Sequence, residues 1–580
     1  MCCERAPASR RGHVLKLLER NCVRTVSEIR RMGDIRKHFL GLVAALLILI
    51  TNAFAASDKA AAPRIDAKPK KPAPGAEIFN NKHVLAISIE ISTNELKALQ
   101  RDARRYARAN VREGTNLWKD VGVHLKGAAG SFRGLEDRPA LTLSFSKFTP
   151  DQKFHGLKKI HLNNSIQDPS YMTENLCGEL FRNAGVPAAR VSYASLELNG
   201  RKKGLYVLKE GFEKEMLGLY FKKTKGNLYD GGFLREITDP LERDEGQGDD
   251  VDGWQDLKAL AKAAQSTNML TRFSELTNVL DMDRFISFTV LEVITTDWDG
   301  YVMNRNNYRV FHDLGTDKMV FFPHGMDQMF WYADWPLIPP NMNGLVAQAT
   351  VRTPEGRQHY LERFGEIFTN VFRLEFLTNR VNELAALIRP ALTNLHGPNA
   401  GRDYDGPSKR MMDLIVARHA FLTKKLAEPE PGTVKFENGI ARLTGWEIPQ
   451  NMVEQGSAQR NKVTIDSKQT LHIQTSNYTT ASWRTRVMLA AGHYRFEASA
   501  KTAGVAPVAD TQKGEGAGIR ISGSQSPRPN KLSGDAAWQS LAYEFDVTLP
   551  MEDVQLVCEL RASKGEAWFD AESLKLVKLK

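Results

Sequence analysis

The sequence predicts an α+β fold with two domains, a mixed domain over residues 78–427 and an all-β sandwich over residues 433–580. In the first region, alternating strands are interleaved with long amphipathic helices. After a linker rich in Pro and Glu at 427–432, only short β-like segments separated by Gly, Asn and Ser turns remain. A length of 580 residues also exceeds that of one ordinary domain.

The first 55 residues have the pattern of a leader. Basic residues precede an unbroken apolar run at 39–50, and small residues follow at Ala53 and Ala55. Twelve apolar residues are too few for a membrane-spanning helix of about 20 residues. We expect a secretory signal that is cleaved after Ala55. The mature protein is then exported to the periplasm, the cell surface or the medium, without a transmembrane span. An uncleaved membrane anchor is the alternative.

Charge and cysteine content narrow the choice of partners. The formal net charge is +11, but the first 55 residues carry ten basic and four acidic side chains, which leaves +5 for the remainder. This excess is too small to predict a nucleic-acid partner. Of the five cysteines, only Cys177 and Cys558 lie beyond the leader, in different domains, so no disulfide framework is expected.

The mixed domain begins with strands. Residues 56–77 are rich in Ala, Pro and Lys and predict a flexible linker. Alternation and amphipathic spacing then predict the following elements: a strand at 83–92, a helix at 93–109, strands at 121–127, 140–148 and 156–164, a helix at 168–185 with Asp168 as its cap, and a hairpin over 190–211 that turns at Asn199-Gly200.

Helices dominate the second half of this domain. Residues 212–290 are expected to be mostly helical, and a helix at 281–296 leads into the polar stretch "TTDWDGYVMNRNNYRVFHD" at 295–313. A strand at 318–331 that runs into a Pro-Gly turn and long helices at 354–390 and 407–427 complete the domain.

Acids and amides gather in the polar stretch. Asp299 precedes Asn304 by five positions, and D-x-x-x-x-N is the spacing of the protein-kinase catalytic loop, in which the Asp orients the substrate hydroxyl and the Asn binds a metal. Asp327 follows in a strand-turn context and provides a second hard oxygen ligand for Mg²⁺. Asn306 and Asn307 are alternatives to Asn304 as the amide ligand. The preceding order of strands, Gly-containing turn and helix is that of a kinase small lobe, so the sequence predicts a two-lobed kinase-like domain.

Phosphates require a cation, and three lysines are candidates. Lys158 and Lys159 are neighbours on one predicted strand and therefore point to opposite faces; Lys126 is the third candidate. Glu174, one turn into its helix, either pairs with such a lysine or lies on a solvated face. Glu210 ends the last small-lobe strand, where a kinase hinge contacts adenine.

Five segments in order resemble the CotH family, the spore-coat-protein-H-like atypical kinases: "GLKKIHLNN", "GLYVLKEGFEKEML", "GNLYDG", "DGYVMNRNNYRVFHD" and "FFPHGMDQMF". The resemblance covers about residues 78–427. It implies a kinase-like fold that binds ATP and Mg²⁺ and phosphorylates Ser or Thr of proteins. Asp299 matches the catalytic aspartate and Asp327 the metal-binding aspartate of the family.

One position departs from the family pattern. CotH proteins usually carry Trp-Asp-Leu-Asp where this chain has His324 to Asp327, so Gly325 replaces an acid. The departure leaves two functional hypotheses: an exported protein kinase, or a catalytically weak kinase-like scaffold in a carbohydrate-binding or adhesive surface protein.

The C-terminal segments "LAAGHYRFEASAKT", "WQSLAYEFDV" and "GEAWFDAESLKLVKL" resemble jelly-roll carbohydrate-binding modules. This resemblance implies a glycan partner. It also implies a structural Ca²⁺ near "KFENG" (435–439) and Asp570.

Overall fold

The computed structural model describes residues 72–128, 130–245, 254–268, 271–339, 342–428, 433–449, 456–508, 515–523 and 527–579. The expected leader, most of the expected linker and the acidic stretch at 246–253 lie outside these ranges. Within them, no helix combines the length and the apolar character needed to cross a membrane. Cys177 and Cys558 are both buried as free thiols, as expected.

Seven strands close into a barrel in the order β1-β2-β3-β4-β5-β7-β6. Their bounds are Leu85–Ile91 (β1), Ala107–Glu113 (β2), Asn116–Lys126 (β3), Ala140–Ser144 (β4), Lys159–Asn163 (β5), Val191–Leu198 (β6) and Arg201–Glu210 (β7). Parallel pairing of β1 with β6, with Leu85 beside Ala194, completes the closure. Alternating apolar side chains fill the interior, among them Val123, Leu141, Leu143, Ile160, Leu162 and Leu208.

The barrel differs from the predicted elements at its N-terminal side. The predicted helix over 93–109 ends early: α3 spans Thr93–Arg101, with Ser92 as its N-cap. The following residues form β2, because Ala107, Ala109 and Val111 alternate inward against the barrel core. Residues 73–79 are also packed rather than free, since Gly75 N–H donates to His155 O (2.8 Å) and Ile78 is buried.

The predicted hairpin and the first long helix are present. Asn199 and Gly200, both at positive φ, turn β6 into β7. Helix α4 spans Thr173–Asn183 and begins five residues later than predicted, so Met172 and not Asp168 is its N-cap residue. The Asp168 carboxylate nevertheless accepts Thr173 N–H at 2.9 Å from outside the helix. One face of α4 is therefore fixed against the barrel, with Tyr193 and Val207 in the same core.

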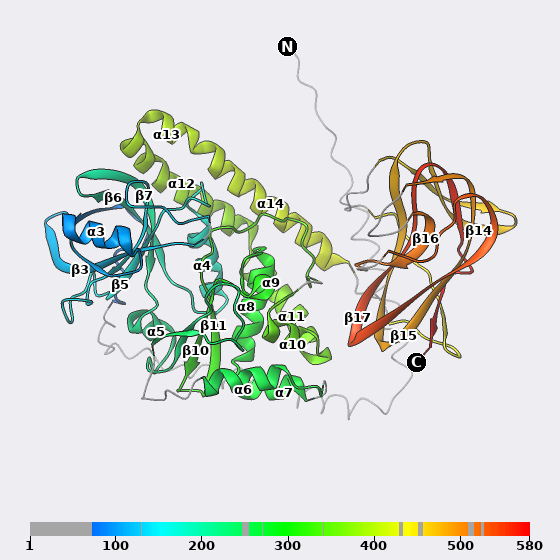
Figure 1. Ribbon diagram of the computed structural model, residues 1–580, viewed down its shortest axis with the longest axis horizontal. Helices are drawn as coiled ribbons and strands as arrows, with labels where there is room; N and C mark the ends of the chain where they lie inside the picture. The colour runs from blue at the N-terminus through cyan, green and yellow to red at the C-terminus, as the bar shows by residue number, and fades with distance from the viewer. Residues whose placement is uncertain are drawn as a thin grey trace, which may run out of the picture. The chain divides into compact units, whose positions relative to one another are not determined.

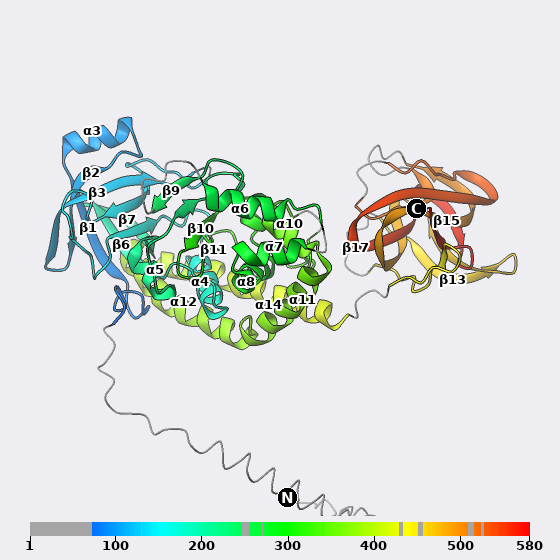
Figure 2. The same ribbon diagram turned by 90° about the horizontal axis from the view of Figure 1, so that it is seen from below.

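A second sheet follows in the order β11-β10-β8-β9. Its strands are Leu228–Asp230 (β8), Glu242–Glu245 (β9), Tyr308–Asp313 (β10) and Lys318–Pro323 (β11). The first two lie in the stretch that was predicted to be mostly helical. In Figures 1 and 2, β10 and β11 lie between the barrel strands and the helices α6, α7 and α8.

Helices make up the rest of the mixed domain. Their bounds are Lys214–Tyr220 (α5), Gln255–Ala264 (α6), Arg272–Val279 (α7), Met282–Ile294 (α8), Tyr301–Asn304 (α9), Leu345–Val351 (α10), Pro354–Asn370 (α11), Leu374–His396 (α12), Pro398–Asp403 (α13) and Asp405–Ala427 (α14). Helix α8 is almost entirely buried. It therefore forms the centre of the helical part, and the polar stretch 295–313 begins directly after its C-terminal end.

The described residues from 433 onward form an all-β domain, which is called the sandwich below after its predicted class. Its paired strands are Ile440–Arg442 (β12), Gln459–Ile465 (β13), Lys468–Thr475 (β14), Thr479–Pro507 (β15), Gly516–Ile521 (β16), Gly534–Asp570 (β17) and Lys575–Lys578 (β18). β15 and β17 are long extended runs that pair with each other over most of their length. A separate apolar core, which includes Trp446, Trp483, Phe496 and Phe569, lies inside this domain.

Candidate active site

The outer face of the barrel carries a row of polar side chains. His161 on β5 is paired in register with Lys209 on β7 and with Thr142 on β4. Lys126 and Asn163 extend the same face, because strand residues two apart point the same way. Their neighbours, such as Leu125 and Leu162, point into the barrel core. Alternation alone therefore produces a polar face on an otherwise apolar sheet.

A buried ion pair lies at the centre of this row. Lys209 Nζ is 3.0 Å from Glu174 Oε1, and the two side chains are 0% and 4% exposed. Asn163 Nδ2 donates to Glu174 Oε2 at 2.6 Å, and Lys126 Nζ donates to Asn163 Oδ1 at 2.7 Å. Burial alone would raise the pKa of Glu174, but the ammonium groups of Lys209 and Lys126 bring it below its ordinary value. Glu174 is therefore an ionised partner of lysine, the first of its two expected roles.

The lysine that pairs with Glu174 is not one of the two favoured from the sequence. Lys159 points to the polar face but binds Glu213, and its side chain is 26% exposed. Lys158 precedes it, lies outside β5 and is half-buried. Lys209 holds the central place instead, because its ammonium reaches Glu174 directly, whereas Lys159 at the start of β5 binds Glu213. Lys126, the third candidate, is part of the cluster.

Glu210 points away from this cluster. It follows Lys209 in the strand, so the two side chains lie on opposite faces of β7. Arg190 binds its carboxylate with Nε 2.9 Å from Oε2, and the Glu210 side chain is 1% exposed. The backbone N–H of Glu210 donates to Arg190 O at 3.0 Å. The carboxylate thus serves this ion pair, and the expected adenine contact remains a prediction.

Two amides hold the carboxylate of Asp299. Asn304 Nδ2 donates to Oδ1 at 2.9 Å, and Asn307 Nδ2 donates to Oδ2 at 2.9 Å and to the backbone carbonyl of Asp299 at 3.1 Å. The loop that carries these residues connects α8, the short helix α9 and β10. The carboxylate is consequently fixed in orientation before any ligand binds.

A second carboxylate, that of Glu292, holds the backbone of this loop. Glu292 on α8 accepts the backbone N–H groups of Tyr301 (3.2 Å) and Val302 (2.7 Å).

Asp297, in the same loop, is only 2% exposed. Burial and the nearby Asp299 and Asp327 carboxylates raise the pKa of Asp297 well above the ordinary range. Glu292 and Asp297 both touch the Cα side of Gly300, where a Cβ would lie 2.7 Å from Glu292 Oε2 and 2.8 Å from Asp297 Cγ. Gly300 is therefore required for the loop to close over α8.

Lys209, Lys126, Glu174 and Asn163 form what is called the lysine cluster below. Asp327 lies in the turn after β11, close to this cluster. Burial, together with the Glu174 and Asp168 carboxylates, raises the pKa of Asp327 to about 7. His324 in the same turn has its Nδ1 3.5 Å from Lys209 Nζ. Burial and the positive charges of Lys209 and Arg309 lower the pKa of His324 well below its ordinary value, so the imidazole is neutral. The turn therefore joins the metal candidate to the lysine cluster.

The chemistry of Asp327 and Asn304 suits a divalent cation. Asp327 and the amide oxygen of Asn304 are hard oxygen donors, and the crowding that raises the pKa of Asp327 is relieved when a cation binds. No three His, Cys, Asp or Glu side chains form a ready-made metal cage in the described part of the chain. Two protein ligands suit Mg²⁺, which usually takes its remaining ligands from phosphates and water.

Asp570, which was expected to be near a Ca²⁺ ion in the sandwich, has protein partners. The Asp570 carboxylate is bound by the Lys468 ammonium, and its Oδ1 accepts Glu572 N–H at 3.1 Å. The Asp570 carboxylate thus has a lysine partner in this structure, and the expected Ca²⁺ remains a prediction.

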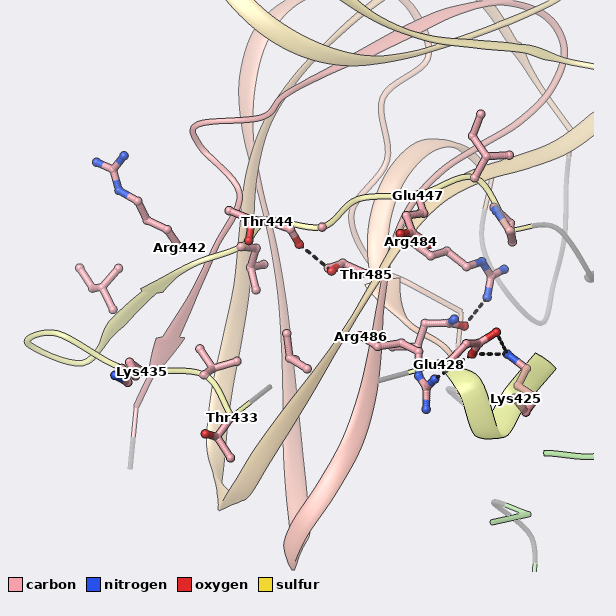
Figure 3. A pocket seen from close by; sticks show the side chains of 18 of the residues that line it. Lys425, Glu428, Thr433, Lys435, Arg442, Thr444, Glu447, Arg484, Thr485 and Arg486 are labelled. Atoms are coloured by element: carbon pink, nitrogen blue, oxygen red, sulfur yellow. Dashed lines mark hydrogen bonds and ion pairs between the residues drawn. The ribbon is translucent and has the colours of Figure 1, made fainter. Parts of the chain in front are cut away.

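The sandwich carries a pocket whose lining includes none of the candidate catalytic residues. It is lined by part of the segment 433–449, including Thr433, Lys435, Arg442, Thr444 and Glu447, and by the β15 residues 484–487 (Figure 3). Thr485 Oγ1 donates to Thr444 O at 2.7 Å across this wall, and Arg484 binds Gln555 Oε1 at 2.8 Å. None of the described residues around this pocket is aromatic. The stacking surface that sugar rings favour is therefore missing from this wall.

Sequence reasoning missed Lys209, Asn163 and the role of Asn307. A signal for the first two was present: both stand in segments that resemble the family, "GLYVLKEGFEKEML" and "GLKKIHLNN". Period-2 alternation also places Lys209 on the face opposite Glu210. Only the pairing of β5 with β7 shows that this face is the one that meets α4.

The chain resembles known proteins over the region that carries this site. A family model described as CotH kinase protein matches residues 123–422. The inner spore coat protein H of Bacillus subtilis is 23% identical over 322 residues, which cover 51% of this chain and 86% of that protein. Invasin CotH2 of Rhizopus delemar is 23% identical over 266 residues, 40% of this chain and 44% of that protein.

Solved structures show only distant likeness. The proinflammatory kinase CtkA of Helicobacter pylori is 9% identical with a TM-score of 0.24, over 51% of this chain and 97% of that chain. A carbohydrate-binding module in complex with beta-1,4-galactotriose, TmCBM61, is 11% identical with a TM-score of 0.16, over 24% of this chain and 92% of that chain. The family match, in contrast, covers more than half of the sequence and includes Glu174, Lys209, Asp299 and Asp327. On this basis the chain belongs to the CotH family.

Proposed function

We propose that this protein is an ATP- and Mg²⁺-dependent kinase that transfers the γ-phosphate to a Ser or Thr hydroxyl of another protein. The observation that carries the proposal is the buried Lys209–Glu174 ion pair, because kinases use such a strand-lysine and helix-glutamate pair to hold phosphates. The barrel with α4 would then form one lobe and the helices around α8 the other.

Each residue of the cluster has a task in this proposal. Lys209 and Lys126 attract the phosphates, and Glu174 and Asn163 fix the positions of the two ammonium groups. Asp327 and Asn304 would hold Mg²⁺, which neutralises charge on the phosphates. Asp299 accepts a hydrogen bond from the attacking hydroxyl, and its own orientation is set by the two amides that bind it.

A thermal-shift titration tests nucleotide binding directly. A ligand that binds only the native state raises the melting temperature in proportion to the logarithm of its concentration. We expect ATP to raise the melting temperature when Mg²⁺ is present and to have a much smaller effect when EDTA is added. Transfer is then measured with a Ser-rich peptide. A chain that shows no shift with ATP and Mg²⁺ has no nucleotide site, and the kinase proposal fails.

Nucleotide affinity should be highest between the pKa values of Asp327 and Lys126 and should fall on either side. Asp327, with a pKa of about 7, is protonated at lower pH, so a proton competes with the metal and affinity falls. Burial and the charge of Lys209 lower the pKa of Lys126 to about 8, so at higher pH this side chain loses the charge that attracts phosphate. Calorimetric titration of ATP with Mg²⁺ from about pH 6 to about pH 9 should therefore give a bell-shaped affinity profile.

Single substitutions test which side chain causes the fall in ATP affinity at low pH and which causes the fall at high pH. Lys126→Met should remove the fall at high pH and leave the fall at low pH. Asp327→Asn should do the reverse, at a lower overall affinity. An affinity that stays constant over the whole range would contradict both assignments.

Export is the second part of the proposal and rests on the leader sequence. The basic residues, the apolar run at 39–50 and Ala53 and Ala55 support a cleaved secretory signal. N-terminal sequencing of the exported protein should find Ala56 as its first residue. Retention of residues 39–50 in a membrane fraction would instead favour an anchor. A glycan partner for the sandwich is proposed only from its resemblance to carbohydrate-binding modules.

A non-catalytic scaffold is the second candidate function. The sequence observation that raises it is Gly325, which replaces an acid of the CotH pattern. The scaffold hypothesis predicts ATP binding without transfer, or neither activity, so the same two assays distinguish it from the kinase.

A further inference from the structure

We propose that Asn307 and Gly325 form a matched pair that fixes the position of Asp299 relative to the turn carrying Asp327. Asn307 is thus a positioning residue, and Gly325 is the residue that gives it space. The catalytic consequence rests on the proposed kinase function, whereas the contact itself does not.

The orientation of the Asn307 amide is determined by its partners. Its Nδ2 approaches two acceptors of Asp299, the carboxylate Oδ2 at 2.9 Å and the backbone carbonyl at 3.1 Å. Only an N–H group can approach two acceptors this closely, because a carbonyl oxygen in the same place would be repelled. The other end of the amide, Oδ1, must therefore point away from Asp299.

That oxygen points at Gly325. A Cβ built on Gly325 would lie 2.7 Å from Asn307 Cγ, 3.3 Å from Nδ2 and closer still to Oδ1, and these are its three nearest atoms. His324 N–H also donates to Asn307 O at 2.9 Å, and Asp327 N–H donates to Gly325 O at 3.0 Å. One residue thus contacts Asp299 with one end of its side chain and the turn of Asp327 with the other.

The backbone of both residues suits this arrangement. Gly325 has φ +58° and Asn307 has φ +51°, in the left-handed region. Glycine adopts this region freely, and asparagine is one of the few other residues that tolerates it. The left-handed conformation of Asn307 and its contact with Gly325 together require these two residue types. Gly325 is then the complement of Asn307, rather than a sign of a lost activity.

The separation of Asp299 from Asp327 matters because one orients the nucleophile and the other holds the metal in the proposed reaction. A misplacement of about 1 Å between reacting groups can lower the rate by about 10²-fold. Removal of the Asn307 side chain should therefore slow transfer and leave the lysine cluster and Asp327 able to bind the nucleotide.

The contact is tested first by thermal unfolding, without any substrate. Gly325→Ala introduces both left-handed strain and the collision with Asn307. Gly114→Ala is the matched control, because Gly114 has φ +56° and nothing lies within 4 Å of its built Cβ. We expect Gly325→Ala to lower the melting temperature clearly more than Gly114→Ala.

A double variant isolates the collision. Asn307→Gly deletes the amide without strain, because glycine accepts the positive φ of this position. In that background, Gly325→Ala should lower the melting temperature only as much as Gly114→Ala does in the wild type. If Gly325→Ala has the same effect with and without Asn307, the two residues are not a matched pair and the proposal is overturned.

Kinetics test the positioning role. Asn307→Gly should lower kcat by about 10²-fold and leave the Kd for ATP with Mg²⁺ within about twofold of wild type. Asn304→Ala, which removes a proposed metal ligand, should weaken ATP binding as well. Equal kcat in wild type and Asn307→Gly would refute the positioning role. If the wild type transfers no phosphate at all, the kinase proposal fails, while the unfolding comparison still decides whether the contact exists.

Discussion

Asp299→Ala is expected to leave Mg²⁺-dependent ATP binding near the wild-type value and to lower the transfer rate by about 10²–10⁴-fold, the usual loss for a positioned acid–base group. Its carboxylate contacts Asn304 and Asn307 and no member of the lysine cluster. Its interaction with the hydroxyl therefore counts chiefly in the transition state and not in nucleotide affinity. The measurement combines single-turnover transfer to a Ser-rich peptide with calorimetric ATP binding.

Asp327→Ala is the matched variant and should fail in both assays. It removes the carboxylate proposed to hold Mg²⁺, so Mg²⁺-dependent ATP affinity should fall by at least about tenfold. ATP binding measured in EDTA should change little, because the lysine cluster remains. If both variants match the wild type in both assays, the two aspartates have no part in phosphoryl transfer and the scaffold hypothesis stands.

Lys209→Met should destabilise the domain by about 3–5 kcal/mol, the cost of leaving a buried charge without its partner. The reason is that Glu174 is 4% exposed and would keep only Asn163 Nδ2 as a direct partner. Chemical denaturation of the domain measures this loss. ATP binding should disappear in the same variant, because the central phosphate cation has been removed.

Two further variants separate charge from packing. Lys159→Met breaks a partly exposed pair with Glu213, so it should cost no more than about 1 kcal/mol. The double variant Lys209→Met, Glu174→Leu removes both buried charges and should recover much of the stability without ATP binding. If Lys159→Met were the more damaging of the two single lysine variants, the assignment of the phosphate lysine would be wrong.

Much of the fold and half of the site could be predicted from local patterns. The β6–β7 turn follows from Asn199-Gly200, helix α8 from its apolar face, and the sandwich from short strands between turn residues. Asp299, Asn304, Asp327 and Glu174 could be selected because their chemistry and spacing are local properties of the sequence. The predicted helix over 93–109 was too long, since residues 107–113 are held as a strand by their barrel neighbours.

The residue types available for phosphate, metal and hydroxyl, and their order along the chain, could be identified from local sequence patterns. Which lysine meets Glu174 and which asparagine reaches Gly325 depends on long-range packing. Lys209 and Glu174 are 35 residues apart, and Asn307 and Gly325 are 18 apart, and each pair meets because separate elements pack together. Alternation tells which side of a strand a residue occupies, but the partner of that side depends on strand pairing and helix packing, which local patterns do not contain.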